Sequence, residues 1–156
     1  MTDDRTEGRT TTLSGDSTAR GEQMARGAVD KLGFAHDQIV QEYNWDDDVD
    51  EALRAAIEEV VGIELEDEDY TGVVDAVIMW WRDDDGDLTD ALVDTLGTLA
   101  EGSSIVLLTP RPGQHGEVDP SEVDEAATTA GLHTSGSVMC SEGWVATRLA
   151  ARKGVA

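Results

Sequence analysis

Basic residues, cysteine, proline and aromatic residues are all scarce in this sequence of 156 residues. Only 11 lysines and arginines oppose 34 acidic residues, which gives a formal net charge of −23. The chain therefore lacks the cationic surface that nucleic acids and anionic membranes attract, and we expect neither as a partner. The single cysteine, Cys140, cannot form an internal disulfide, and this favours a reducing, cytoplasmic setting.

Long apolar runs are absent as well. No stretch approaches the roughly 20 residues that a membrane-spanning helix needs. The acidic start MTDDRTEG has neither the basic nor the apolar segment of a signal peptide. We therefore expect a cytoplasmic protein, and its hydrophobic fraction of 39% is enough for one small domain.

The first part of the chain differs in composition from the rest. Residues 1–27 are polar, rich in Thr, Ser and Gly, and show no apolar period, so we predict a disordered acidic or polar tail. Thr10, Thr11 and Thr12 are either a phosphorylation site or plain solubilising residues. Apolar residues recur from residue 28 to residue 153, which predicts a single folded domain there.

The acidic residues concentrate in the middle of this domain. Between Asp46 and Asp94 lie 19 of the 34 acids, opposed only by Arg54 and Arg82. Many of them interrupt apolar runs at regular spacing, so we expect a folded, acid-coated surface rather than an acidic tail.

Short apolar segments alternate with amphipathic segments along the domain. Strands are predicted at residues 39–45, 63–65, 73–81, 104–109, 132–139 and 144–151. Helices are predicted at about 28–34, 49–61, 87–100 and 120–130. Asp48, Asp87 and Asp119 each precede a helical pattern and are the expected N-caps.

This alternation predicts an α/β fold, namely a three-layer Rossmann-like sandwich. Strands separated by helices imply right-handed parallel crossovers. The turn CSEG between the last two strands is too short for a crossover, so the mostly parallel sheet should contain a C-terminal antiparallel strand. We predict the strand order 2-1-3-4-6-5, with helices on both faces.

In such a sheet, ligands bind beyond the carboxyl ends of the strands, at the point where the strand order reverses. The loops at 44–48, 81–85 and 109–115 should surround that crevice. They supply the candidate ligand-binding residues Asn44, Trp45, Asp46, Trp81, Arg82, Asp83 and His115. No glycine-rich turn offers amides to a phosphate there, and the aspartates would repel one, so a neutral or cationic ligand fits better.

The aspartates of the first two loops also raise the question of a metal. Weak magnesium or calcium candidates are Asp46, Asp48, Asp83 and Asp85, although they lack EF-hand spacing. A solvated acidic rim with helix caps explains the same residues. We predict no bound metal and no cofactor.

No catalytic constellation is evident. His36, His115 and His133 have no Cys or His partner at zinc-binding spacing. Cys140 and His133 lie at opposite ends of one predicted strand, over about 20 Å apart, so we discount a dyad. The sequence has neither a Gly-x-Ser-x-Gly elbow nor a Walker loop. We predict no catalytic residue.

Three segments carry a family resemblance: LGF-x4-IVQEYNWDDDVDEALRAAIE, DEDY-x4-DAVIMWWRDDDGDLTDALVD and SSIVLLTPRPG-x2-GEVDPSEVDEAATTAGL. From about Leu32 to Lys153 the chain resembles the "domain of unknown function 3052" family, small proteins of high-GC Gram-positive bacteria. The resemblance implies a compartment but no activity. More distantly, the layout is similar to an abridged S-adenosylmethionine-dependent methyltransferase. Those enzymes have a Gly-x-Gly-x-Gly-type turn after strand one, where this chain has Asn44 to Asp48.

These observations predict a non-enzymatic, acidic, Rossmann-like protein that acts as a regulatory or protein-binding module. Its expected partner is a basic protein. The alternative is a minimal or degenerate S-adenosylmethionine-dependent methyltransferase-like enzyme, for which S-adenosylmethionine would be the cofactor. The oligomeric state is left open by the sequence.

Overall fold

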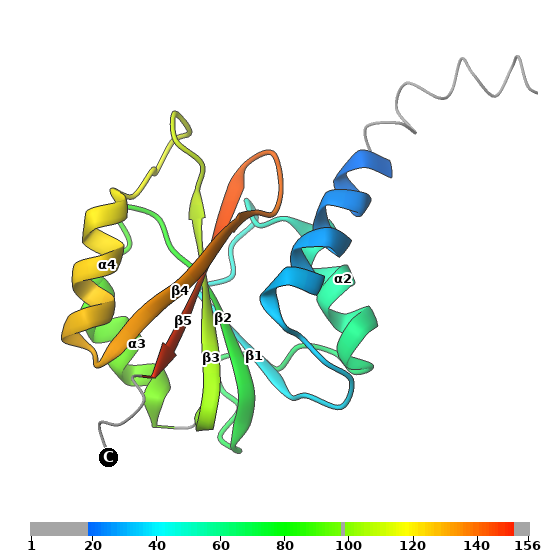
Figure 1. Ribbon diagram of the computed structural model, residues 1–156, viewed down its shortest axis with the longest axis horizontal. Coiled ribbons are helices and arrows are strands. Elements are labelled where there is room, and N and C mark those ends of the chain that lie inside the picture. The colour runs from blue at the N-terminus through cyan, green and yellow to red at the C-terminus, as the bar shows by residue number, and fades with distance from the viewer. Residues whose placement is uncertain (1–18, 98, 152–156) are drawn as a thin grey trace, which may run out of the picture.

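The computed structural model describes residues 19–97 and 99–151. A five-stranded mixed sheet with helices on both faces runs through this part of the chain (Figure 1). Across the sheet the strands are β1 (Val40–Tyr43), β2 (Val74–Trp80), β3 (Leu99–Pro110), β5 (Trp144–Ala151) and β4 (Leu132–Met139). The first three are parallel, and β5 is antiparallel to both of its neighbours. The predicted α/β fold is confirmed.

The predicted strand at 63–65 does not form. Beside β1 there is only an isolated parallel bridge between Gln41 and Glu66, in which the Glu66 amide donates to the Val40 carbonyl at 2.8 Å. Leu65 is partly buried against the core, but acidic residues flank it on both sides and Ile63 is exposed, so the segment has little apolar surface to bury as a strand. The sheet therefore has five strands, and the predicted order of six strands, 2-1-3-4-6-5, is not confirmed as stated.

Local capping sets where the three labelled helices begin: α2 (Glu51–Val61), α3 (Leu88–Leu96) and α4 (Pro120–Thr129). As predicted, Asp87 caps α3 and Asp119 caps α4. The expected cap of α2, Asp48, is wrong. Asp50 caps this helix instead, and its Oδ1 accepts from the Leu53 amide at 2.8 Å. The side chain of Asp48 is held by Arg82.

The helix predicted at 87–100 ends earlier than expected. α3 stops at Leu96, and Leu99 already pairs with Val74 in the sheet. β3 is therefore longer than the predicted strand 104–109. Pairing with β2 overrides the helical pattern of these residues, because a backbone buried in a sheet must satisfy its hydrogen bonds there.

A further helix, residues 19–32, precedes β1 and is called the N-terminal helix here. The predicted boundary of the tail, residue 27, is therefore too late. Ala25, Ala28, Val29 and Leu32 share one face of the helix and are buried against the sheet. Alanines contribute little hydrophobicity, so this stripe gave a weak pattern. The threonines at positions 10–12 lie outside the described residues.

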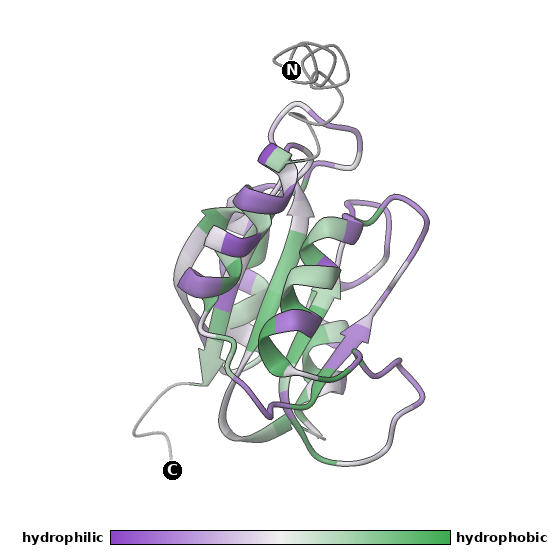
Figure 2. Ribbon diagram, turned by 90° about the vertical axis from the view of Figure 1, so that its right-hand side faces the viewer, coloured by the Kyte–Doolittle hydropathy of each residue, from purple (hydrophilic) through white to green (hydrophobic). Residues whose placement is uncertain are grey.

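Both faces of the sheet are buried. The N-terminal helix and α2 cover the face that carries Trp80, while α3 and α4 cover the opposite face, which carries Trp81 (Figure 1). The strands are largely hydrophobic, and hydrophilic residues gather on the helices and loops (Figure 2). Among the described residues, no helix combines the length and apolarity that crossing a bilayer requires.

Candidate functional site

Arg82 follows β2 and fills the space beyond the carboxyl ends of β1 and β2. Its Nη1 donates to the Asn44 carbonyl at 3.0 Å and lies 3.3 Å from an Asp85 carboxylate oxygen. Its Nε donates to Asp48 at 3.1 Å, and Nη2 binds the same carboxylate. Every nitrogen of the guanidinium thus donates to the chain itself, and the side chain is only 12% exposed.

The indole of Trp144 covers this cation. The Arg82 Cζ lies 5.2 Å from the ring centroid, within the range of a cation–π contact. Trp144 Nε1 donates to the Asp48 carbonyl at 3.2 Å. Burial pushes the pKa of Arg82 down, but hydrogen bonds and charge from Asp48 and Asp85 outweigh burial and leave the pKa raised. Asn44, Asp48, Arg82, Asp85 and Trp144 are called the Arg82 cluster below.

Backbone conformation brings the loops together around this cluster. Asn44 has φ 61°, the left-handed region that Asn tolerates better than most residues, and its amide donates to Glu68 at 2.9 Å. Gly116 has φ 84°, and a Cβ there would lie 3.2 Å from the Arg82 Cβ. The Gly116 carbonyl accepts from the Asp83 amide at 3.0 Å. The loop after β3 therefore packs directly on Arg82.

A second polar network lies under the cluster, toward α2. Trp80 and Trp144 pack edge to face with ring centroids 4.9 Å apart. Trp80 Nε1 donates to Glu42 at 2.9 Å, and Arg54 donates two hydrogen bonds, of 2.7 and 2.8 Å, to the same carboxylate. The hydrogen bonds that Arg54 donates to Glu42 raise the pKa of Arg54 despite burial, and Glu51 adds to this effect. Glu42, only 6% exposed, is thereby fully paired.

The structure brings only part of the predicted site together. Asn44 and Arg82 are in contact, and the Asp83 backbone holds the adjacent loop. Trp81 is buried under α3 and α4, away from the cluster. Trp45 is 51% exposed.

Asp46 and His115 are exposed residues at the edge of this region. Asp46 accepts from the Asp47 amide at 2.8 Å, so part of its carboxylate is used locally. The ligand-binding role of the seven candidate residues stays a prediction.

The arrangement does not favour the weak magnesium or calcium site. Asp48 and Asp85 both pair with the guanidinium of Arg82, which offsets one of their two negative charges and occupies oxygens that a metal would need. Asp46 and Asp83 are not part of that contact. Over residues 19–97 and 99–151, no group of three or more acidic, His or Cys side chains has a geometry that could hold a metal ion.

Cys140 and His133 do not form a pair. Cys140 is fully buried, and desolvation raises the pKa of its thiol to about 12. Its Sγ donates to the Trp144 carbonyl at 3.5 Å. His133 is exposed near the start of β4. A thiol in this state is a poor nucleophile.

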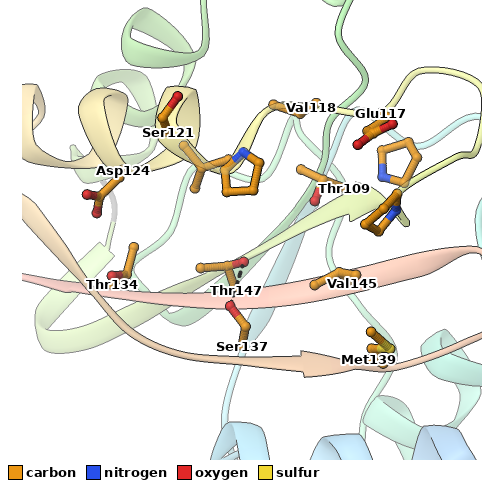
Figure 3. Close-up of a pocket in the computed structure, with 14 residues that line it drawn as sticks. Thr109, Glu117, Val118, Ser121, Asp124, Thr134, Ser137, Met139, Val145 and Thr147 are labelled. Atoms are coloured by element: carbon orange, nitrogen blue, oxygen red, sulfur yellow. Dashed lines mark hydrogen bonds between the residues drawn. The ribbon is translucent and has the colours of Figure 1, made fainter.

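Sequence reasoning missed a cavity of about 670 Å³ between α4 and the strands β3, β5 and β4, called the α4 cavity below (Figure 3). Its floor includes Thr134, Ser137, Val145 and Thr147. One sequence signal could have revealed this cavity. Two consecutive strands carry small, mostly hydroxyl-bearing residues at positions where a covered sheet usually carries large apolar ones.

The strand order and the helices on both faces define an α/β protein with a methyltransferase-like fold. Mitomycin 7-O-methyltransferase is similar with a TM-score of 0.61 and 13% identity over 84% of this chain, which spans 54% of that enzyme. An O-methyltransferase of neocarzinostatin biosynthesis, solved with S-adenosyl-L-homocysteine, gives a TM-score of 0.60 at 15% identity over 93% of this chain and 60% of that one. At such identities the likeness concerns the fold alone.

The chain belongs to the family described as protein of unknown function (DUF3052), whose model matches residues 29–153. The predicted family resemblance is confirmed. Uncharacterized proteins of Mycobacterium tuberculosis (strain H37Rv) and Mycobacterium bovis are each 50% identical over 135 residues, covering 86% of this chain and 85% of the relative.

Proposed function

We propose that this protein is a non-enzymatic binding module whose acidic surface recruits a basic protein partner. The observation that carries the proposal is the position of Arg82. A methyltransferase-like sheet binds its ligand beyond the carboxyl ends of its strands. In this chain that space is filled by a guanidinium that Asn44, Asp48 and Asp85 hold and Trp144 covers.

The residues at the strand ends do not suit S-adenosylmethionine. A ligand entering beside β1 would have to displace Arg82 and leave the carboxylates of Asp48 and Asp85 without their cation. The turn after β1 has no glycine, so no Cβ-free backbone is available there for close approach of a ligand. The chain has a methyltransferase-like fold, but Arg82 and its partners within the chain occupy the space beyond the strand ends.

The surface between α3 and α4 suits a basic partner. Asp83, Asp87, Glu122 and Glu125 line a hollow of about 490 Å³, called the acidic hollow, and none of its lining residues is basic. On a chain with a net charge of −23, such a surface attracts cations and speeds association with a positively charged protein.

Calorimetry with S-adenosylmethionine and with S-adenosylhomocysteine tests the non-enzymatic part of the proposal. We expect no binding heat at micromolar concentrations for the wild-type protein. Micromolar binding would overturn the assignment.

The partner is tested by cross-linking and purification from host extract with two matched variants. E122Q/E125Q removes two charges from the acidic hollow, whereas D30N/E59Q removes two from the opposite side of the sheet. We expect one basic protein to be retained by the wild type and by D30N/E59Q, and to be lost from E122Q/E125Q and at high salt. Equal retention by both variants, or no partner even at low salt, contradicts the proposal.

The second candidate function is a minimal S-adenosylmethionine-dependent methyltransferase-like enzyme. The observation that favours it is the fold likeness to mitomycin 7-O-methyltransferase over 84% of this chain. Under this alternative Arg82 swings out when the cofactor binds. R82A should then bind S-adenosylmethionine more tightly than the wild type, whereas the binding-module proposal expects both proteins to be silent in calorimetry.

A further inference from the structure

We propose that the α4 cavity binds a small organic cation, an apolar body that carries an ammonium group. This site is separate from the function proposed above. The α4 cavity shares no residue with the Arg82 cluster, and none of the four acids of the acidic hollow lines it. Its volume of about 670 Å³ lies within the range of small-molecule sites, roughly 300–1,000 Å³.

A β-bulge builds the floor of the cavity. Thr134 and Ser137 are three residues apart and would point to opposite faces of a regular strand. The register of β4 against β5 shifts between Thr134 and Gly136, and Gly136 has φ 148°. The extra residue turns Thr134 and Ser137 to the same side, where both line the cavity (Figure 3). Bulges often re-aim side chains beside binding sites.

Small side chains keep the space above this floor open. α4 packs on the sheet through the small residues Val123, Ala126 and Ala127. These side chains fill only part of the space between the helix and the sheet. In Figure 3 Thr147 and Val145 of β5 lie across the cavity from Ser121 and Val118. Larger residues at these positions would close the cavity, so its volume follows directly from the choice of side chains.

The lining selects an amphipathic ligand. Apolar groups come from Val118, Val123, Val145, Met139 and three prolines. The hydroxyls of Ser137 and Thr147 lie 3.3 Å apart and hydrogen bond to each other across β4 and β5. An apolar body in contact with these groups would remove their surface from water, and the hydroxyls could orient it.

The charged groups of the lining are both acidic. Glu117 and Asp124 lie at the rim, and none of the 14 lining residues is basic. Glu117 accepts from the Gly113 amide at 3.0 Å. Within the part of the chain that the structure describes, the Asp124 carboxylate makes no hydrogen bond or ion pair. An ammonium group at the rim would pair with Asp124, whereas a carboxylate or phosphate would be repelled.

Nuclear magnetic resonance titration with three probes tests this site. Tryptamine, indole and indole-3-propionate present the same ring system with a positive, zero or negative charge. We expect tryptamine to shift the amide signals of Ser137, Val145 and Thr147 at millimolar concentration, indole to shift them more weakly, and indole-3-propionate to leave them in place.

Two exposed aspartates provide the matched variants. D124N should weaken tryptamine binding by about fivefold, the effect of losing one partly exposed ion pair. D94N removes the same charge from α3, away from the cavity, and should change the affinity little. V145W should abolish the shifts by filling the cavity, and D124N decides the question if V145W fails to fold.

Three results would overturn the proposal. The first is the absence of tryptamine shifts at the cavity residues. The second is equal binding of tryptamine and indole-3-propionate. The third is an equal effect of D124N and D94N, since this would show that tryptamine responds only to the net charge of the protein.

Discussion

Arg54→Met should leave the carboxylate of Glu42 without its cation between the sheet and α2. Glu42 is 6% exposed and would keep only the hydrogen bond from Trp80. Removing one partner of a buried ion pair costs about 3–5 kcal/mol. Because Arg54 is 25% exposed, water can enter after the substitution, so we expect a loss of about 2–3 kcal/mol in the free energy of unfolding.

A double-mutant cycle separates the ion pair from general packing. E42Q retains an acceptor for Trp80 Nε1 and leaves Arg54 its contact with Glu51, so this variant should lose about 1–2 kcal/mol. In E42Q/R54M no charge is left buried, so the loss should fall at least about 1 kcal/mol short of the sum of the two single losses. Arg26→Met is the control, because the Arg26–Glu59 contact at 3.9 Å is exposed.

Urea unfolding followed by tryptophan fluorescence measures these differences. With a slope of about 2 kcal/mol per molar urea, R54M should lower the midpoint by about 1–1.5 M with the slope unchanged. A loss below about 1 kcal/mol for R54M, or strictly additive losses in the double variant, would refute the view that Glu42 depends on Arg54.

Four further predictions follow from the charges and caps. Raising the salt concentration from about 0.1 to 1 M should raise the melting temperature by screening the net charge of −23, and a decrease contradicts this. D50A should lower the unfolding free energy by about 1 kcal/mol, and an unchanged urea midpoint would mean that the cap of α2 contributes nothing. Cys140, with a thiol pKa of about 12, should react with a disulfide reagent at pH 8 far more slowly in the native protein than in urea, and equal rates would show that it is accessible. Hydrogen bonds from the Ser121 backbone and hydroxyl lower the pKa of Asp119. The stabilising effect of the Asp119 carboxylate should therefore be complete above the ordinary carboxyl pKa and disappear as the pH falls through the lowered value. A titration midpoint of Asp119 at or above the ordinary carboxyl value contradicts this prediction.

Features set by neighbouring residues could be predicted from the sequence. Asp87 and Asp119 cap their helices because each needs only the amides two or three residues ahead. β4 and β5 also have the predicted bounds, since a tight turn joins two runs of suitable residues.

Features set by distant contacts could not be predicted in the same way. Asp48 and Asp50 satisfy the local capping rule equally well, and only the position of Arg82 decides between them. The arrangement of the side chains around Arg82 depends on Trp144. Its indole Nε1 donates a hydrogen bond to the carbonyl of Asp48, which lies 96 positions earlier in the chain. The small hydroxyl-bearing residues of the α4 cavity are visible in the sequence, but the register shift in β4 that brings them to one side is not, because no periodicity of apolar residues reveals it.

The place of β5 in the sheet has a consequence for folding. β5 follows β4 in the chain but lies between β3 and β4, so β4 has no sheet partner until β5 is in place. A chain cut before residue 144 would leave one side of β3 open and β4 unpaired, and such exposed strand edges promote aggregation. The sheet therefore cannot be completed strand by strand from the N-terminus. Its final closure depends on the segment that also supplies Trp144 to the Arg82 cluster, which couples completion of the core to assembly of the strand-end contacts.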